Sequence, residues 1–303
     1  MIYIALIPLI MAMARTDTPR LGAQWYGRID DRYVMAGRQW VKLEARWDYV
    51  EAVRGVYEWQ WDVDINAEYL WESGTPLLLM FHNSPAWSRC EPYNCRLPDS
   101  EHWFEFARFI LAAIDRYHPQ AIEIWNEPEA GVSDGILNWC CGCVVDPLAY
   151  TRLLEYIYPL VKQAHPDVII LGGALTQQDT AWSRAFLASK PRMDALSWHY
   201  YSWAYAGQAT VTGDALVTRR DQLAQAGYPL WLTETSHVCA LPDCGDAFRL
   251  MQDYWLRAVA DAPGLEAVLW YTTPWVNWAS CEMVHGGTEY PVWDTFEALI
   301  QGG

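Results

Sequence analysis

Short apolar runs alternate along the chain with longer segments in which apolar residues recur every three or four positions. The runs are typical of buried strands, and the longer segments are typical of amphipathic helices. Eight strands are predicted, at residues 21–26, 40–45, 76–81, 121–125, 168–171, 195–198, 230–233 and 267–271. Helices are predicted between them, at residues 61–72, 102–117, 147–164, 215–225 and 247–260.

This alternation predicts an α/β fold with parallel strands. Eight repeats match a single-domain (β/α)₈ TIM barrel, whose usual size is about 250 residues. A doubly wound open sheet is the alternative, but no G-x-G-x-x-G motif follows the first predicted strand. Because no linker or charge block divides the chain, we expect one catalytic barrel from residue 20 to residue 303.

The composition narrows the possible partners of this fold. Of 303 residues 52% are hydrophobic and 19% charged, which is typical of a globular protein. A net charge of −16 argues against a broad basic face, so we expect no nucleic-acid partner. The small number of basic residues also argues against a pocket specific for uronic acids, although one Arg would be enough to bind a carboxylate. The 19 Trp and 18 Tyr suit stacking on sugar rings, although large barrels also use Trp for packing.

The first 14 residues, MIYIALIPLIMAMA, form an uncharged apolar run that ends just before Arg15. The run resembles the apolar region of a signal peptide followed by an Ala-Met-Ala cleavage site, so we expect a secreted or extracytoplasmic protein. No basic residue precedes it, so a mis-assigned start or an apolar arm packed on the barrel is the alternative. The run is too short to span a bilayer, and no stable membrane insertion is expected.

Eight cysteines are an even set that suits an exported protein with disulfides. Cys90 with Cys95 and Cys239 with Cys244 would close short loops beyond predicted strands, while the pairing of cysteines 140, 141, 143 and 281 stays open. A zinc site in the 140–143 cluster is the alternative. Its spacing is not C-x-x-C and no His is nearby, so we expect no metal site there.

Two predicted strands end in a glutamate. IWNEP (residues 124–128) closes the fourth strand with Glu127, and WLTET (residues 231–235) closes the seventh with Glu234. The carboxyl ends of barrel strands carry the chemistry, so both carboxylates are expected to face each other across a bound substrate. Paired carboxylates cleave glycosidic bonds, with retention at a separation of about 5–5.5 Å and inversion at about 6.5–9.5 Å.

Trp-Asn-Glu-Pro at strand four with Thr-Glu at strand seven resembles the large clan of retaining glycoside hydrolases built on (β/α)₈ barrels. Within that clan the chain is most similar to the family 39-like glycosidases. Other segments that fit this resemblance are GRQWVK (37–42), WDYVE and RGVYEW (47–51 and 54–59), SPAW (84–87) and HYY (199–201). The resemblance extends from about residue 21 to residue 273.

The resemblance implies that Glu127 is the general acid/base and Glu234 the nucleophile, with no cofactor. Expected substrate-binding residues are Asn126 for a sugar 2-hydroxyl, Tyr201 beside the nucleophile, Trp270 as a stacking floor, and His199, Lys42 and Trp87. The family usually has Arg at the position of Lys42, and a Lys keeps the charge without the fork of donors. Glu123 faces the same way as Glu127 and is expected to be a buried anchor.

The expected activity is therefore hydrolysis of a β-linked, equatorial glycosidic bond in an oligosaccharide or polysaccharide by double displacement. A transglycosidase would use the same residues, with a sugar in place of water as the acceptor. A catalytically silent carbohydrate-binding barrel would keep the aromatic residues and lose an acid, whereas both glutamates are present.

The cysteine pattern can be tested directly. We expect Cys90–Cys95 and Cys239–Cys244 to be disulfides that each stabilise the fold modestly, because they close short loops. Thiol titration of the denatured, unreduced protein should then find at most four free thiols of eight. Six or more free thiols would contradict both pairs.

Overall fold

The computed structural model describes residues 20–29, 34, 37–89, 96–129, 145–176, 180–205, 208–209, 213–239, 245–272, 283–285 and 288–302. In this part of the chain eight parallel strands form a closed ring, and pairing of β1 with β9 and of β5 with β6 completes the closure. The strands are β1 (Arg20–Gln24), β2 (Trp40–Arg46), β3 (Leu77–His82), β4 (Ala121–Ile124), β5 (Ile169–Leu175), β6 (Ala195–Tyr205), β8 (Leu230–Cys239) and β9 (Leu265–Tyr271). The predicted (β/α)₈ barrel is confirmed.

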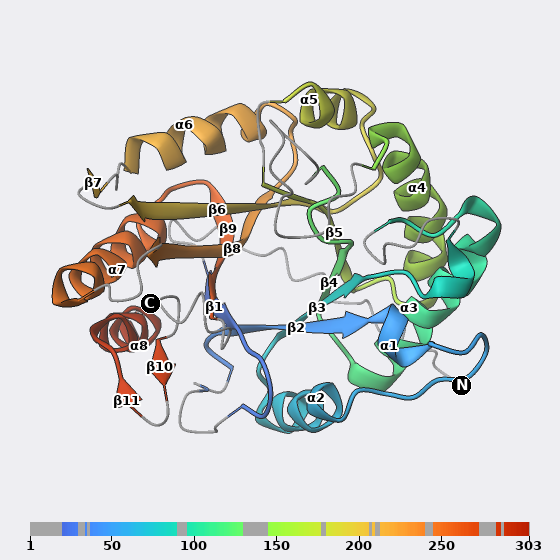
Figure 1. The fold of residues 1–303 in the computed structure, drawn as a ribbon, viewed down its shortest axis with the longest axis horizontal. Helices are drawn as coiled ribbons and strands as arrows, with labels where there is room; N and C mark the ends of the chain where they lie inside the picture. Colours follow the sequence, from blue (N-terminus) through green and yellow to red (C-terminus); the bar gives the residue numbers. More distant parts are fainter. Residues whose placement is uncertain are drawn as a thin grey trace, which may run out of the picture.

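Helices surround the ring of strands (Figure 1). They are α1 (Trp47–Val50), α2 (Trp61–Ser73), α3 (Trp103–Tyr117), α4 (Pro147–Ala164), α5 (Ala181–Ala188), α6 (Gly213–Ala224), α7 (Gly245–Ala260) and α8 (Pro291–Gly302). Short 3₁₀ turns lie at Ala86–Ser88 and Ser100–His102. Strand β7 (Gln208–Ala209) pairs antiparallel with β6, and β10 (Val284–His285) pairs with β11 (Thr288–Glu289).

Every predicted strand and helix is present, but β6 and β8 are longer than the apolar runs predicted. They continue to Tyr205 and Cys239 because they pair with each other along this whole length. None of the described helices is both long and apolar enough to cross a membrane. The predicted signal segment and all cysteines except Cys239 lie outside the described residues, and nothing is described of the Cys239 side chain.

Alternation along the strands divides the barrel into two apolar regions. One set of side chains packs outward against the helices and forms the main core. The other set fills the barrel floor, where the rings of Trp40 and Trp231 meet edge to face with centroids 4.9 Å apart. This floor consists of Trp40, Leu78, Ala121, Leu171, Ala195, Trp231, Ala267 and Leu269.

Polar side chains lie above this apolar floor. On β2, Lys42 and Glu44 follow Trp40 by two and four residues, so all three point into the barrel. The barrel interior is therefore apolar toward the amino ends of the strands and charged toward their carboxyl ends. This arrangement places Lys42 and Glu44, and with them Glu123 and Glu234, near the mouth, where barrel enzymes carry their active sites.

The contact between Trp40 and Trp231 in the barrel floor predicts how their replacement changes the stability of the fold. Trp40→Ala and Trp231→Ala should each lower the free energy of unfolding by about 3–5 kcal/mol, because each removes a buried ring and leaves a cavity. The double variant should lose less than the sum, since both changes open the same space. Trp61→Ala, whose side chain is 67% exposed on α2, is the control and should change stability by less than about 1 kcal/mol. Denaturant unfolding measures all four; additive losses would contradict the shared cavity.

Candidate active site

Glu127 is presented by a sharp turn at the end of β4. Trp125 and Glu127 both have left-handed backbone conformations, with φ of 73° and 44°. Such conformations cost non-glycine residues about 1–3 kcal/mol each and persist only when the surroundings hold them. The buried Trp125 ring packs edge to face on Phe106, with centroids 5.7 Å apart. Packing thus fixes the turn that aims Glu127.

A buried tyrosine on α4 fixes the same strand end. The Tyr150 hydroxyl donates a hydrogen bond to the carbonyl of Ile124, and it accepts one from the Gly173 backbone N–H at 3.0 Å. One side chain thereby joins the ends of β4 and β5 directly below the turn. Tyr150 was not predicted, because nothing in a helical pattern shows which tyrosine reaches a strand end.

Glu234 is presented by a β-bulge in β8. On β6, Trp198 and His199 are consecutive, but their partners on β8 are Leu232 and Glu234, so Thr233 is an extra residue. The extra residue lets two consecutive side chains of β8 point into the barrel, as bulges beside active sites commonly do. Thr233 Oγ1 donates to Glu123 Oε1 at 2.7 Å, and Glu234 reaches the substrate side.

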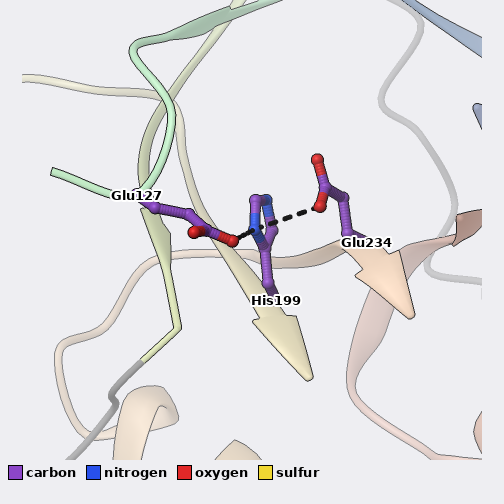
Figure 2. Close-up of side chains that lie close together, drawn as sticks. All are labelled: Glu127, His199 and Glu234. Atoms are coloured by element: carbon purple, nitrogen blue, oxygen red, sulfur yellow. Dashed lines mark hydrogen bonds and ion pairs between the residues drawn. The ribbon is translucent and has the colours of Figure 1, made fainter. Parts of the chain in front are cut away.

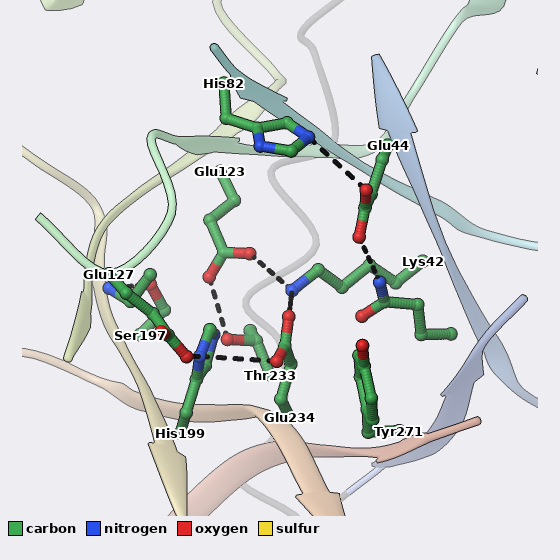
Figure 3. A network of polar contacts seen from close by, with 12 residues as sticks. Lys42, Glu44, His82, Glu123, Glu127, Ser197, His199, Thr233, Glu234 and Tyr271 are labelled. Atoms are coloured by element: carbon green, nitrogen blue, oxygen red, sulfur yellow. Dashed lines mark hydrogen bonds and ion pairs between the residues drawn. The ribbon is translucent and has the colours of Figure 1, made fainter. Parts of the chain in front are cut away.

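Both oxygens of Glu234 have partners. Lys42 Nζ lies 2.8 Å from Glu234 Oε1 and 2.9 Å from Glu123 Oε2, and the Tyr201 hydroxyl donates to Glu234 Oε2 at 2.6 Å. Figure 3 shows Lys42 between the two carboxylates. Burial, together with the charge of Glu234, raises the pKa of Tyr201 well above its usual value, so its hydroxyl stays a donor. The expected position of Tyr201 beside Glu234 and the buried position of Glu123 agree with this geometry.

His199 lies between the two glutamates (Figure 2). Its Nδ1 is 2.8 Å from Glu127 Oε1 and 3.4 Å from Glu234 Oε2, and one oxygen of each carboxylate lies within 4.8 Å of the other. Burial acts to lower the pKa of His199, but the charge of Glu234 and the hydrogen bond to Glu127 outweigh it and raise the pKa. The imidazolium form is therefore stabilised between the carboxylates.

A second polar group, absent from the sequence prediction, lies beside Lys42 in the barrel mouth. Glu44 Oε1 accepts hydrogen bonds from Gln24 Nε2 at 2.5 Å and from the Tyr26 hydroxyl at 2.7 Å, and Glu44 Oε2 lies 3.3 Å from His82 Nε2. Burial opposes ionisation of Glu44, but contacts with His82 and Tyr26 lower its pKa to about 2. The only sequence signal was that Glu44 follows Lys42 by two residues on one strand.

The structure places Trp270 away from the site, which corrects its expected role as a stacking floor. Trp270 is fully buried in the core between the barrel and the helices, on the face opposite to Ala267 and Leu269. The neighbouring residue, Tyr271, faces the mouth instead (Figure 3), where its ring meets Tyr201 edge to face at 5.8 Å. Successive side chains of a strand point to opposite faces, so Trp270 and Tyr271 lie on different sides of β9.

Three other expected substrate-binding residues occupy different settings. Lys42 is fully buried beneath the nucleophile, so it positions Glu234 and does not contact substrate. Trp87 is half-buried, packs on Trp47 at 5.3 Å, and has no contact with either glutamate in the described chain. Asn126 is half-buried beside Glu127, and its buried Oδ1 accepts no hydrogen bond from the described residues. Binding of a sugar hydroxyl by Asn126 stays a prediction.

Glu127, His199 and Glu234 are the one group of described side chains arranged so that they could hold a metal ion. The surrounding contacts disfavour a cation there. The Lys42 ammonium contacts Glu234 Oε1, the Tyr201 hydroxyl donates to Oε2, and the raised pKa of His199 favours its protonated form, which repels a cation. The donor set suits acid-base chemistry better than metal binding.

Comparison with known families agrees with this geometry. The model of the cellulase family, glycosyl hydrolase family 5, matches residues 23–281. The chain belongs to this family. The predicted resemblance to glycoside hydrolases built on (β/α)₈ barrels is thereby confirmed. A search of the curated proteins found no match for this family 5 chain.

Solved structures of low sequence identity share the fold of this family 5 protein. A family 39 glycoside hydrolase from Bacteroides cellulosilyticus is 17% identical with a TM-score of 0.66, and the match covers 94% of this chain and 64% of that one. A family 30 subfamily 8 xylanase from Clostridium acetobutylicum is 14% identical, with a TM-score of 0.64 and coverages of 96% and 73%. A fungal β-1,4-galactanase is 16% identical, with a TM-score of 0.63 and coverages of 92% and 99%. The family 39 structure supports the predicted family 39-like fold, and the chain spans 64% of the length of that protein.

The position of His199 between the two carboxylates predicts how its pKa changes when either glutamate is replaced. Because Glu127 and Glu234 raise the pKa of His199, Glu127→Gln and Glu234→Gln should each lower it. Histidine NMR titration measures the change. His237 is the internal control, because burial alone lowers its pKa to about 4 and neither glutamate contributes. An unchanged pKa of His199 in both variants would contradict the bridge.

Proposed function

We propose that the protein is a retaining glycoside hydrolase that cleaves a β-linked, equatorial glycosidic bond in an oligosaccharide or polysaccharide. The observation that carries this proposal is the pair of carboxylates, Glu127 and Glu234, with oxygens within 4.8 Å of each other. Retaining enzymes hold their two carboxyl groups about 5–5.5 Å apart and inverting enzymes about 6.5–9.5 Å apart, so this short oxygen-oxygen separation favours retention.

In this mechanism Glu234 attacks the anomeric carbon while Glu127 protonates the leaving oxygen. Contacts of Lys42 and Tyr201 with the two oxygens of Glu234 hold it in one orientation for attack. Glu127 then removes a proton from the water that hydrolyses the glycosyl-enzyme ester. Asn126 adjoins Glu127, and its Oδ1 accepts no hydrogen bond from the described residues, which supports a role in binding the sugar 2-hydroxyl, a contact that strengthens in the transition state.

The polar group around Glu44 supports a neutral sugar on the nucleophile side. Because the pKa of Glu44 is lowered to about 2, its carboxylate is ionised at neutral pH, and the side chain is 20% exposed in the barrel mouth. A fixed carboxylate accepts hydrogen bonds from hydroxyl groups and repels another carboxylate. We therefore expect the cleaved sugar to carry hydroxyl groups there and no acid.

Hydrolysis of an aryl β-glycoside, followed by proton NMR of the first-released sugar, tests the proposal. Release of phenol with a β-configured product is expected. No release across a panel of neutral aryl glycosides would favour a silent binding barrel, and an α-configured first product would overturn retention. A sugar acceptor that diverts the product from hydrolysis would favour the transglycosidase.

Replacing the two glutamates should impair different steps of the reaction. Glu234→Ala should abolish turnover, because no glycosyl-enzyme forms. Glu127→Ala should retain the first step on aryl glycosides with good leaving groups, because a phenolate of low pKa needs no proton. Its second step should be slow and should be accelerated by azide, giving a β-glycosyl azide. Stopped-flow and product analysis measure these steps; azide rescue of Glu234→Ala with retention would reverse the assigned roles.

Export is part of the same proposal. The apolar run at residues 1–14 and the closely spaced cysteine pairs support an extracytoplasmic, disulfide-containing enzyme. Amino-terminal sequencing of protein from the culture medium should begin at or near Arg15. Recovery of the whole product inside the cells with residues 1–14 attached would contradict export.

A further inference from the structure

A cavity of about 490 Å³ lies outside the barrel, between the segment after β3 and the first turns of α3 and α4. Three arginines line it, Arg89, Arg96 and Arg152, together with the ring of Trp103. The whole chain has only 21 basic residues against 37 acidic ones. Three guanidinium groups around one cavity therefore depart from the charge of the rest of the molecule.

Two of these guanidinium groups have no partner among the residues that the structure describes. Arg96 and Arg152 are exposed, and their side chains form no ion pair or hydrogen bond with the described residues. Arg89 is half-buried, and its Nε donates to the Ser84 carbonyl at 2.9 Å. Both acidic residues of the cavity, Asp99 and Asp146, lie at helix or turn starts, and Asp146 Oδ1 accepts the Leu148 N–H that begins α4.

One wall of the cavity is hydrogen-bonded to the segment that follows the catalytic acid. Val145 lines it, and the Val145 backbone N–H donates to the carbonyl of Pro128 at 3.0 Å, directly after Glu127. In the proposed reaction Glu127 protonates the leaving oxygen, so the substrate beyond the cleaved bond extends on the side of Glu127. The cavity therefore borders the segment that carries Glu127, whereas Glu44 lies on β2 with Lys42, beside the nucleophile.

We propose that this cavity binds the carboxylate of a uronic acid residue on the leaving-group side of the substrate; this inference rests on the proposed function. A guanidinium group pairs with a planar carboxylate through two parallel hydrogen bonds, and Arg96 and Arg152 have these donors available. The face of Trp103 packs against the sugar ring. The volume is within the range of about 300–1,000 Å³ typical of small-molecule sites. The preferred substrate is thus neutral at the cleaved sugar and acidic beyond it.

Binding of methyl β-D-glucuronide to the intact protein tests the cavity, with methyl β-D-glucoside as the neutral match and acetate as the simple anion. The glucuronide should shift the indole N–H signal of Trp103 in an NMR titration. Both controls should bind at least about tenfold more weakly, because one lacks the carboxylate and the other lacks the ring.

The double variant Arg96→Gln/Arg152→Gln should weaken glucuronide binding at least about tenfold. Arg192→Gln is the matched control, because Arg192 is exposed over the ring of Tyr158 and lies outside the cavity. Unchanged binding in the double variant, equal weakening in Arg192→Gln, or equal binding of glucoside or acetate would each overturn the proposal.

The same proteins separate this inference from the proposed function. Hydrolysis of a neutral aryl β-glycoside should differ less than about twofold between the double variant and the wild type, since the phenol does not extend to the cavity. Loss of glucuronide binding with hydrolysis intact would be the expected signature. Absence of hydrolysis in the wild type would reject the catalytic function, while glucuronide binding would be decided by the titration alone.

Discussion

The buried ammonium of Lys42 is the interaction on which the site depends. It is fully buried and contacts the carboxylates of Glu123 and Glu234 at 2.9 and 2.8 Å. Burial acts against each charge, but the opposite charges outweigh it, so the pKa of Lys42 is raised and that of Glu123 is lowered. Removing one partner of such a group leaves an uncompensated buried charge, a loss of about 3–5 kcal/mol. Catalytic geometry and fold stability therefore share one ion cluster.

Around that cluster, irregular backbone orients the catalytic glutamates in directions that regular strands do not allow. A regular β8 would send Thr233 and Glu234 to opposite faces, whereas the bulge directs Thr233 to Glu123 and Glu234 to Lys42. The left-handed residues after β4 perform the same task for Glu127. These left-handed conformations are unfavourable by themselves. The packing of Trp125 and the hydrogen bond of the Tyr150 hydroxyl stabilise them, although neither side chain takes part in the chemistry.

Many of the tryptophans pack in the core, whereas the composition suggested that they stack on sugar rings. Six tryptophans are among the largest fully buried side chains, at positions 40, 47, 125, 198, 255 and 270. They fill the barrel floor and the space under the helices. Tyrosines supply the polar aromatic edges of the mouth, where Tyr26, Tyr201 and Tyr271 contact Glu44, Glu234 and one another. A ring with a hydroxyl can be both packed and hydrogen-bonded, which suits this layer.

The sequence by itself determined the barrel and its two glutamates, because strand-helix alternation specifies parallel strands and barrel topology brings all strand ends to one mouth. It did not determine which face of a strand points inward. Barrel strands are buried on both faces, so no polar side marks the interior, and Trp270 was expected where Tyr271 lies. The bulge at Thr233, the pairing of Lys42 with Glu123 and the cluster around Glu44 join distant strands. Only tertiary structure decided them, because each depends on register between strands that local sequence does not encode.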